Sequence, residues 1–356
     1  MAIVLCVTAF IMIWRAGTAA AGSLFVSASY QGPALGVVML DRCEGSGYSA
    51  CPRLRVVDGS ARYTVAVPGA GQGNGVLLLA NGLLWAGRGS VIDRSGDLGR
   101  RWREIHLPGQ LLAWTAQSTG AWAITRSCRH GVRCRTRLWH SFDAGRTWWY
   151  QTLPDAVREA GPKDVFLLSF SNAANGVAVY PRDNGTHTIA ITDDGGHAWS
   201  MHKSPCGEAY DMYEAVGTAA DSVWVVCASE PGTGDQGHEV FVSDDAGVIF
   251  TLRNQAPFLE RDKIGRGLFG AGYLGDIVPA SSQTAFLSLD GDLGDLLRTD
   301  DGGRTWRTLR GFPEGDHSGL GAPSVSANGT DVWEPVLEIG LFASSDGGIL
   351  WHNALP

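Results

Sequence analysis

The stretch Thr299-Asp300-Asp301-Gly302-Gly303-Arg304-Thr305-Trp306 decides the fold of this 356-residue chain. Its pattern is a hydroxyl residue, any residue, Asp, any residue, Gly, any two residues and an aromatic residue. The chain repeats this octet five more times with the spacing intact. The other copies are Ser95, Asp97, Gly99 and Trp102; Ser141, Asp143, Gly145 and Trp148; Thr192, Asp194, Gly196 and Trp199; Ser243, Asp245, Gly247 and Phe250; and Ser344, Asp346, Gly348 and Trp351.

A degenerate seventh copy keeps the spacing but lacks the hydroxyl and the glycine, at Val56, Asp58, Ser60 and Tyr63. The seven first positions fall at residues 56, 95, 141, 192, 243, 299 and 344, which are 39 to 56 residues apart. A period in that range is typical of repeat folds and has room for four strands in each unit.

Each octet has the chemistry of a hairpin turn. The Asp carboxylate can accept hydrogen bonds from backbone N–H groups further along the turn. Glycine tolerates a positive φ that a side chain would penalise. The aromatic residue opens the next strand, where its large area can be buried. We therefore expect the six aspartates to be structural, with all the octet turns on one face and functional groups on the opposite face.

These octets resemble the Asp-box, or BNR repeat, with the pattern S/T-x-D-x-G-x-x-W. The resemblance extends over almost the whole chain after residue 24. That motif occurs in β-propellers of sialidases, sortilin-type receptors, some glucan hydrolases and the photosystem II assembly-factor group. The resemblance implies an all-β protein with a single β-propeller domain at residues 23–356, and an Asp-box between the third and fourth strands of each unit. It does not indicate a function, because catalytic and non-catalytic propellers share the motif.

The runs between the octets favour short strands, since Val, Leu, Phe and Trp alternate with clusters of Gly, Asn, Asp and Pro. We expect seven blades of four antiparallel strands if the degenerate unit counts, and six otherwise. The last unit supplies its own fourth strand at 351–355, and only 154–161 resembles a helix. Three units predict strands at 164–171, 176–182, 186–193 and 198–202; at 211–218, 222–229, 239–244 and 248–254; and at 275–280, 284–290, 295–300 and 305–311.

The first 22 residues resemble a signal peptide. An apolar run from Ala2 to Trp14 precedes Ala19-Ala20-Ala21, a small-residue site of the kind that signal peptidases cut, although no Lys or Arg precedes the run. The run is too short for a membrane-spanning helix. We therefore expect a secreted or extracytoplasmic protein.

Cysteine usage agrees with export, because disulfides persist in oxidising compartments. Removal of the segment that contains Cys6 leaves six cysteines, which allow 15 pairings. The repeat phase favours Cys43 with Cys51 and Cys128 with Cys134, each across a short link between the second and third strands. Cys206 and Cys227 then pair by elimination. The absence of a C-x-x-C spacing argues against a zinc site.

The net charge of −8 and a pI near 5.6 come without a basic stripe. A nucleic acid or an anionic lipid surface is therefore not an expected partner. We expect a monomer that needs no cofactor and that has no strong membrane association once the signal segment is removed.

Two stretches are candidate binding loops. The long link at 253–275 carries mixed charge and is a candidate ligand-binding lip; its charged residues are Glu260, Arg261, Asp262, Lys263 and Arg266. The acidic loop with Asp290, Asp292 and Asp295 is a candidate calcium site, although it lacks the glycine and the distal glutamate of an EF-hand. Plain solvated loops are the alternative for both.

A third stretch bears on catalysis. Sialidase-like hydrolases use a tyrosine nucleophile assisted by a glutamate, with an aspartate as acid/base. The resemblance therefore makes Tyr213, Glu214 and Asp211 catalytic candidates, with an ordinary strand start as the alternative. The family also clamps its substrate with three arginines, the first in an aromatic-Arg-Ile-Pro motif that this chain lacks.

The sequence therefore predicts an exported, non-enzymatic β-propeller that binds a protein or carbohydrate ligand through its loop face. A sialidase-like glycoside hydrolase is the alternative.

Overall fold

The protein is an all-β propeller in the part of the chain that its computed structural model describes. The described residues are 24–32, 35–41, 52–58, 61–68, 77–80, 82–88, 90–117, 120–129, 133–153, 166–182, 186–207, 213–219, 222–230, 236–256, 272–290, 295–309, 323–326, 328–336 and 340–355. This part contains no helix that is long and apolar enough to span a membrane. The helix-like connector expected at 154–161 lies outside it.

The described strands form seven four-stranded antiparallel sheets, and every strand pairs with its neighbour in sequence. The first three sheets contain β1 (Leu24–Gly32), β2 (Leu35–Asp41), β3 (Pro52–Asp58) and β4 (Ala61–Ala66); β5 (Leu77–Ala80), β6 (Leu83–Arg88), β7 (Val91–Ser95) and β8 (Arg103–His106); and β9 (Gln110–Gln117), β10 (Gly120–Arg129), β11 (Arg133–Ser141) and β12 (Trp149–Thr152).

The next two sheets contain β13 (Leu167–Phe170), β14 (Gly176–Pro181), β15 (His187–Thr192) and β16 (Ser200–Lys203); and β17 (Tyr213–Ala219), β18 (Ser222–Ala228), β19 (His238–Ser243) and β20 (Thr251–Ala256). The last two contain β21 (Tyr273–Pro279), β22 (Ala285–Asp290), β23 (Asp295–Thr299) and β24 (Arg307–Thr308); and β25 (Ser324–Val325), β26 (Val332–Val336), β27 (Gly340–Ser344) and β28 (His352–Leu355).

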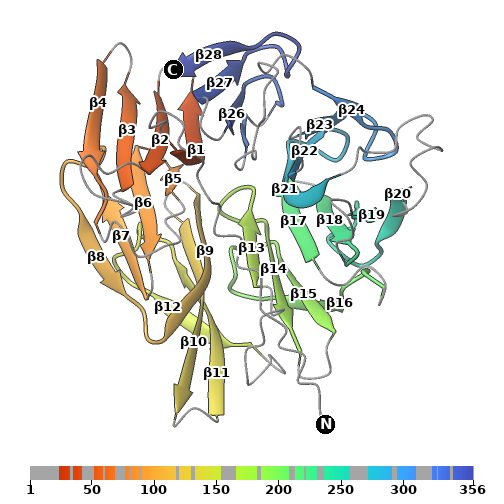
Figure 1. Ribbon diagram of the computed structural model, residues 1–356. Coiled ribbons are helices and arrows are strands. Elements are labelled where there is room, and N and C mark those ends of the chain that lie inside the picture. The colour runs from red at the N-terminus through yellow and green to blue at the C-terminus, as the bar shows by residue number, and fades with distance from the viewer. Residues whose placement is uncertain are drawn as a thin grey trace, which may run out of the picture.

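The sheets follow one another around a centre, and the last lies beside the first (Figure 1). Consecutive first strands contact each other from β1 to β21, and β1 contacts β25 and β26 of the last sheet. At the outer strands, the Arg62 guanidinium on β4 donates a 2.8 Å hydrogen bond to the Ala354 carbonyl on β28. Because both of these sheets consist of consecutive strands, no terminal strand is exchanged between them.

The core lies between neighbouring sheets. Six buried apolar clusters among the described residues each draw on two adjacent sheets. Burial of these faces against one another is the main stabilising contribution of a repeat architecture. Contributing residues of the two sheets are Leu54 and Leu84, Trp85 and Ala123, Ile124 and Ala190, Val179 and Val225, Trp224 and Leu287, and Phe286 and Val332.

The predicted strands occur in all three units, with ends that differ by up to three residues. The fourth strands begin later than expected, at Ser200, Thr251 and Arg307. The reason is that the octet aspartate holds the backbone in the turn as far as the seventh position, so that the aromatic residue ends the turn.

The six octets share one hydrogen-bond network. The first-position hydroxyl donates to Oδ1 of the aspartate over 2.7–2.9 Å and accepts the N–H of the fifth-position glycine over 2.7–3.0 Å. The same Oδ1 accepts the N–H of the seventh residue over 2.8–2.9 Å. In four copies the tryptophan Nε1 donates to the glycine carbonyl and so closes the turn.

The degenerate seventh copy does not form this turn. Asp58 and Ala61 are register partners, so β3 and β4 are joined by a two-residue link. Val56 and Tyr63, the first and last positions of the expected octet, face each other across the strands. The prediction of an octet here was wrong, because this copy lacks the first-position hydroxyl and the fifth-position glycine that the hydrogen-bond network joins.

The fifth-position glycine also joins neighbouring sheets. A Cβ on Gly145, whose φ is +76°, would lie 2.7 Å from Cη2 of Trp85, which is fully buried in the preceding sheet. The fourth position also has a positive φ but admits side chains, as Leu98, Ala144 and Ala246 show. The fifth position therefore needs glycine for packing as well as for backbone conformation.

We predict that Gly145→Ala lowers the free energy of unfolding by about 2–4 kcal/mol, because overpacking against Trp85 adds to the cost of the positive φ. Gly82 is the matched control, since it has the same φ of +76° with nothing within 4 Å of an added Cβ. Gly82→Ala should cost only about 1–2 kcal/mol. Urea unfolding monitored by tryptophan fluorescence measures both, and equal losses would contradict a packing role for Gly145.

The octet carboxylates are stabilised in their ionised form. Burial by itself would raise the pKa of Asp143, but hydrogen bonds from Thr147, Ser141 and the Arg146 N–H outweigh it and lower that pKa from 3.8 to about 2. In Asp301, too, hydrogen bonds outweigh burial and lower the pKa. The pKa is lowered, chiefly by a backbone N–H donor, in Asp97, Asp194, Asp245 and Asp346.

A depressed folded-state pKa makes a contribution to stability that is present above the unfolded-state pKa and is lost as the pH falls through the folded-state value. Asp143→Asn keeps an amide acceptor in the turn but removes the titration. We therefore predict that the stability gap between the wild type and Asp143→Asn shrinks from about pH 4 to about pH 2, as measured by urea midpoints. Asp193→Asn, at an exposed second octet position, is the control. A gap that is constant over this pH range would refute the prediction.

Candidate functional site

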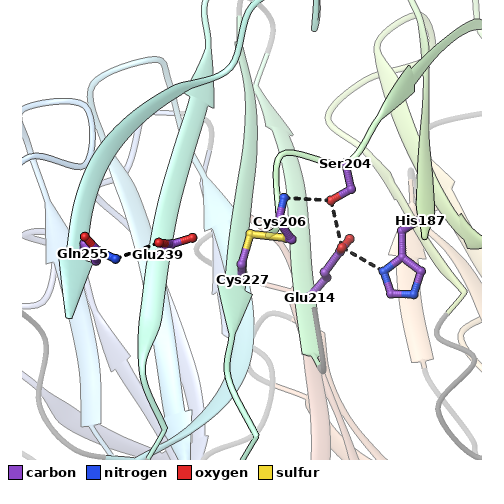
Figure 2. Close-up of a disulfide and its surroundings, with 7 residues drawn as sticks. All are labelled: His187, Ser204, Cys206, Glu214, Cys227, Glu239 and Gln255. Carbon is purple, nitrogen blue, oxygen red and sulfur yellow. Dashed lines mark hydrogen bonds and ion pairs between the residues drawn. A yellow bond between two sulfur atoms is a disulfide. The ribbon is translucent and has the colours of Figure 1, made fainter. Parts of the chain in front are cut away.

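A buried carboxylate organises the face opposite the octet turns, at the junction of two sheets. Glu214 is the second residue of β17, His187 is the first residue of β15, and Ser204 follows β16 directly. Oε1 of Glu214 lies 2.8 Å from Nδ1 of His187 and accepts a 2.8 Å hydrogen bond from the Ser204 hydroxyl. Figure 2 shows the carboxylate between the two partners. Glu214 thus ties the start of one sheet to two strands of the sheet before it.

The local backbone explains this arrangement. The Ser204 N–H donates to the His187 carbonyl over 3.1 Å, which extends the pairing of β15 and β16 by one residue. The Ser204 Oγ in turn accepts the Cys206 N–H over 3.2 Å, so the chain turns towards β17 at this point. These two hydrogen bonds position the serine hydroxyl and the imidazole next to the same carboxylate oxygen.

This arrangement differs from a nucleophilic triad. In a triad the imidazole accepts the proton of the serine hydroxyl, whereas here Ser204 and His187 both contact Oε1 of Glu214. The Glu214 side chain has no exposed area and that of His187 is 7% exposed. A buried carboxylate with two polar partners stabilises the position of strands, because removing one partner leaves an uncompensated charge.

A disulfide also restrains the link between β16 and β17. Cys206 is bonded to Cys227 on β18, and Cys227 is the register partner of both Glu214 and Glu239. This confirms the pairing that was predicted by elimination. Cys128 and Cys134 are also bonded, and they face each other across β10 and β11 as predicted. Cys43 and Cys51 lie outside the described residues.

The structure places only some of the predicted site residues. Tyr213 begins β17, while Asp290 ends β22 and Asp295 begins β23. Among the predicted catalytic, ligand-loop and calcium residues, Glu214 is the one whose side-chain surroundings are described, and it contacts His187 and Ser204. Outside the described part lie Asp211, Glu260, Arg261, Asp262, Lys263, Arg266 and Asp292. Within the described part, no cluster of three or more His, Cys, Asp or Glu residues could hold a metal ion.

Sequence reasoning missed His187 and Ser204, although a positional signal was available for the histidine. His187 lies five residues before Thr192, the first position of its octet. His238 lies five residues before Ser243, in the next sheet, and it is fully buried. Two histidines at one repeat position mark the end of the third strand on this face.

The octet face has a small hollow between the same two sheets. It is open to solvent on one side, and its lining includes Thr192, Thr218 and Ser222. The Thr218 hydroxyl is buried and has no hydrogen-bond partner among the described residues. The hollow is thus lined partly by hydroxyl residues.

Comparisons with known proteins give the fold and no family. No family model matches the chain, and no curated protein matches it. Among solved structures, the GH74 xyloglucanase from Xanthomonas campestris has a TM-score of 0.58 at 13% identity, over 93% of this chain and 54% of that one. This chain thus spans about half the length of the xyloglucanase.

Two other similar structures are matched over nearly their whole length. The ulvan lyase of polysaccharide lyase family PL25 has a TM-score of 0.58 at 10% identity, over 94% of this chain and 97% of that one. The β-propeller domain of the Trilobed protease from Pyrococcus furiosus has a TM-score of 0.54 at 10% identity, over 91% and 96%. At such identities the similarity establishes a propeller fold and leaves the function open.

We predict that Glu214→Ala lowers the free energy of unfolding by about 3 kcal/mol, because His187 and Ser204 lose their shared acceptor in a buried site. Glu239 is the matched control on the other side of Cys227. It is only partly exposed, and it accepts a 2.7 Å hydrogen bond from Gln255 (Figure 2). Glu239→Ala should cost less than about 1 kcal/mol. Urea midpoints measure both changes, and a smaller loss for Glu214→Ala than for Glu239→Ala would count against the structural role.

Proposed function

We propose that the chain is an exported, non-enzymatic β-propeller with seven blades, six of which carry an Asp-box-type turn. It binds a protein or glycan ligand through the links on the face opposite the octet turns. The observation that carries this proposal is the enclosure of Glu214, whose carboxylate is fully buried and bonded to His187 and Ser204. A glutamate in that position fixes a strand start and does not meet a substrate.

Three further observations support the proposal. The shared octet network has the hydroxyl, aspartate and glycine contacts that a turn of the Asp-box type requires. The seven sheets follow one another around a centre with the last beside the first. The two disulfides favour an oxidising, extracytoplasmic compartment, as does the signal-like segment at 1–22.

The binding face is proposed because the link from Ser204 to β17 is held at both of its ends. Hydrogen bonds to Glu214 fix the end of the link that starts at Ser204, and the Cys206–Cys227 disulfide fixes its beginning. Rigid supports reduce the entropy that a loop loses on binding. The charged loop with Glu260, Arg261, Asp262, Lys263 and Arg266 links β20 to β21 in the sequence, and we propose it as the ligand lip.

The first test asks whether the chain is an enzyme. We predict that the full chain does not turn over fluorogenic sialosides or β-glucosides above the uncatalysed rate. Tyr213→Phe and Glu214→Gln are assayed beside it, with thermal unfolding as a check that both variants remain folded. Turnover that both folded variants lose would overturn the binding proposal and identify a hydrolase site at 211–214.

The same preparation tests the binding face on an array of immobilised glycans and secreted proteins. A variant with Glu260, Arg261, Asp262, Lys263 and Arg266 replaced by Gln or Asn should lose at least tenfold in affinity for whichever array member the wild type retains. Neutralising Asp290, Asp292 and Asp295 in the same way is the control and should leave binding unchanged. Equal binding by the two variants would exclude the lip.

A further inference from the structure

A strip of four aromatic rings crosses the octet side of the molecule from one sheet to the next. His140 lies on β11, Phe142 and His197 lie in the octet turns of adjacent sheets, and Trp149 begins β12. The ring centroids of His140 and Trp149 are 6.0 Å apart with an interplanar angle of 20°. Phe142 and His197 stack at 4.8 Å and 21°. His140 joins the two pairs, at 5.2 Å from Phe142 and 5.3 Å from His197.

The strip has an open end. Trp149 is 53% exposed, although tryptophan has the largest apolar surface of any side chain to bury. Its register partner across the strands is His140, which lies beside it and is half-buried. The His197 ring at the other end is also exposed. The strip is therefore supported from below by the sheets and faces solvent above.

Tyr150 provides an internal comparison. It follows Trp149 in the same strand and is equally exposed, at 52%. Successive residues of a strand point to opposite faces, and Tyr150 accordingly packs at 4.7 Å on Trp139 and lies under the Arg137 guanidinium at 4.8 Å. It is thus a ring of similar exposure that lies outside the strip.

Polar groups accompany the rings of the strip. Burial lowers the pKa of His140, and the neighbouring His197 lowers it further while Asp194 opposes both effects. The His140 imidazole is therefore neutral at neutral pH, with one nitrogen that donates and one that accepts. The Asp194 carboxylate lies in the same turn as His197 and is exposed. Aromatic ring faces, hydrogen-bond donors and hydrogen-bond acceptors thus occur together on one surface.

We infer that this strip binds a carbohydrate, with a sugar ring stacked on Trp149 and its hydroxyls bonded by the flanking imidazoles and Asp194. The C–H groups on one face of a pyranose carry partial positive charge, and the face of an aromatic ring is negative. Sugar hydroxyls donate and accept hydrogen bonds, which suits imidazole nitrogens and a carboxylate. An acyl chain would instead desolvate these polar groups without pairing them.

This site goes beyond the binding face proposed above, because it lies at the octet turns, on the opposite side of the sheets. It is also specific to one junction in the described part of the chain. The residue after the octet is Trp149 here, whereas it is Arg103, Ser200, Thr251, Arg307 and His352 in the other five copies. The octets themselves therefore do not require this tryptophan.

Saturation-transfer NMR and isothermal titration with cellohexaose, laminarihexaose and mannohexaose test the inference on the full chain. We expect at least one hexasaccharide to bind, and Trp149→Ala to weaken it at least tenfold. Trp149→Tyr should restore part of the affinity, because it keeps a stacking face. Tyr150→Ala is the matched control and should bind like the wild type. Thermal unfolding of the variants should be unchanged, since both side chains are exposed.

Three outcomes would overturn the inference: no hexasaccharide binds, binding survives Trp149→Ala, or both alanine variants lose it equally. Binding that survives Trp149→Ala but fails in the variant with a neutralised 260–266 loop would place the glycan on the opposite face. That result would support the proposed function while rejecting the strip, so failure of one proposal can be told from failure of the other.

Discussion

The hydrogen bond from the octet glycine N–H to the first-position hydroxyl is the interaction on which this molecule depends most. It fixes the glycine at a positive φ, and that conformation brings the backbone against the preceding sheet at a distance that excludes a Cβ. The aspartate then holds the rest of the turn through its Oδ1. The turn is therefore also the joint between sheets. At one junction the preceding sheet also bonds to the turn, because Trp122 Nε1 donates a 2.7 Å hydrogen bond to the Gly195 carbonyl in the next octet.

Much of this fold could be predicted from the sequence, because the information is local. A turn that needs a hydroxyl, an aspartate and a glycine at fixed spacing can be recognised in the sequence wherever it occurs. The strands between the turns can be predicted from composition. The degenerate unit shows that the spacing alone does not make an octet turn. Asp58 has the right position but no network to join, and the chain there makes a two-residue link. The joint function of the glycine was missed because packing between sheets is not encoded in one segment.

The site was less predictable for the same reason. Glu214 was singled out because it follows a tyrosine near a strand start, yet its environment comes from His187 and Ser204, which belong to a different sheet. Such partners come together only when neighbouring sheets pack side by side in the propeller. The disulfide Cys206–Cys227 could be predicted because elimination needs no geometry. The aromatic strip combines residues of two sheets. Its one signal in the sequence is Trp149, because the other copies have smaller or charged residues at that position.

The pairing of every strand with its neighbour in sequence has a consequence for how the molecule assembles. Each sheet needs only its own unit of the chain, so its hydrogen bonds can form while later units are still being synthesised. The contacts that must wait are those between β1 and the last sheet, and the hydrogen bond from Arg62 to Ala354. Closure of the ring is thus a docking of two finished surfaces, with no strand to be inserted, and an unfinished chain exposes an apolar sheet face only at its growing end and at β1–β4.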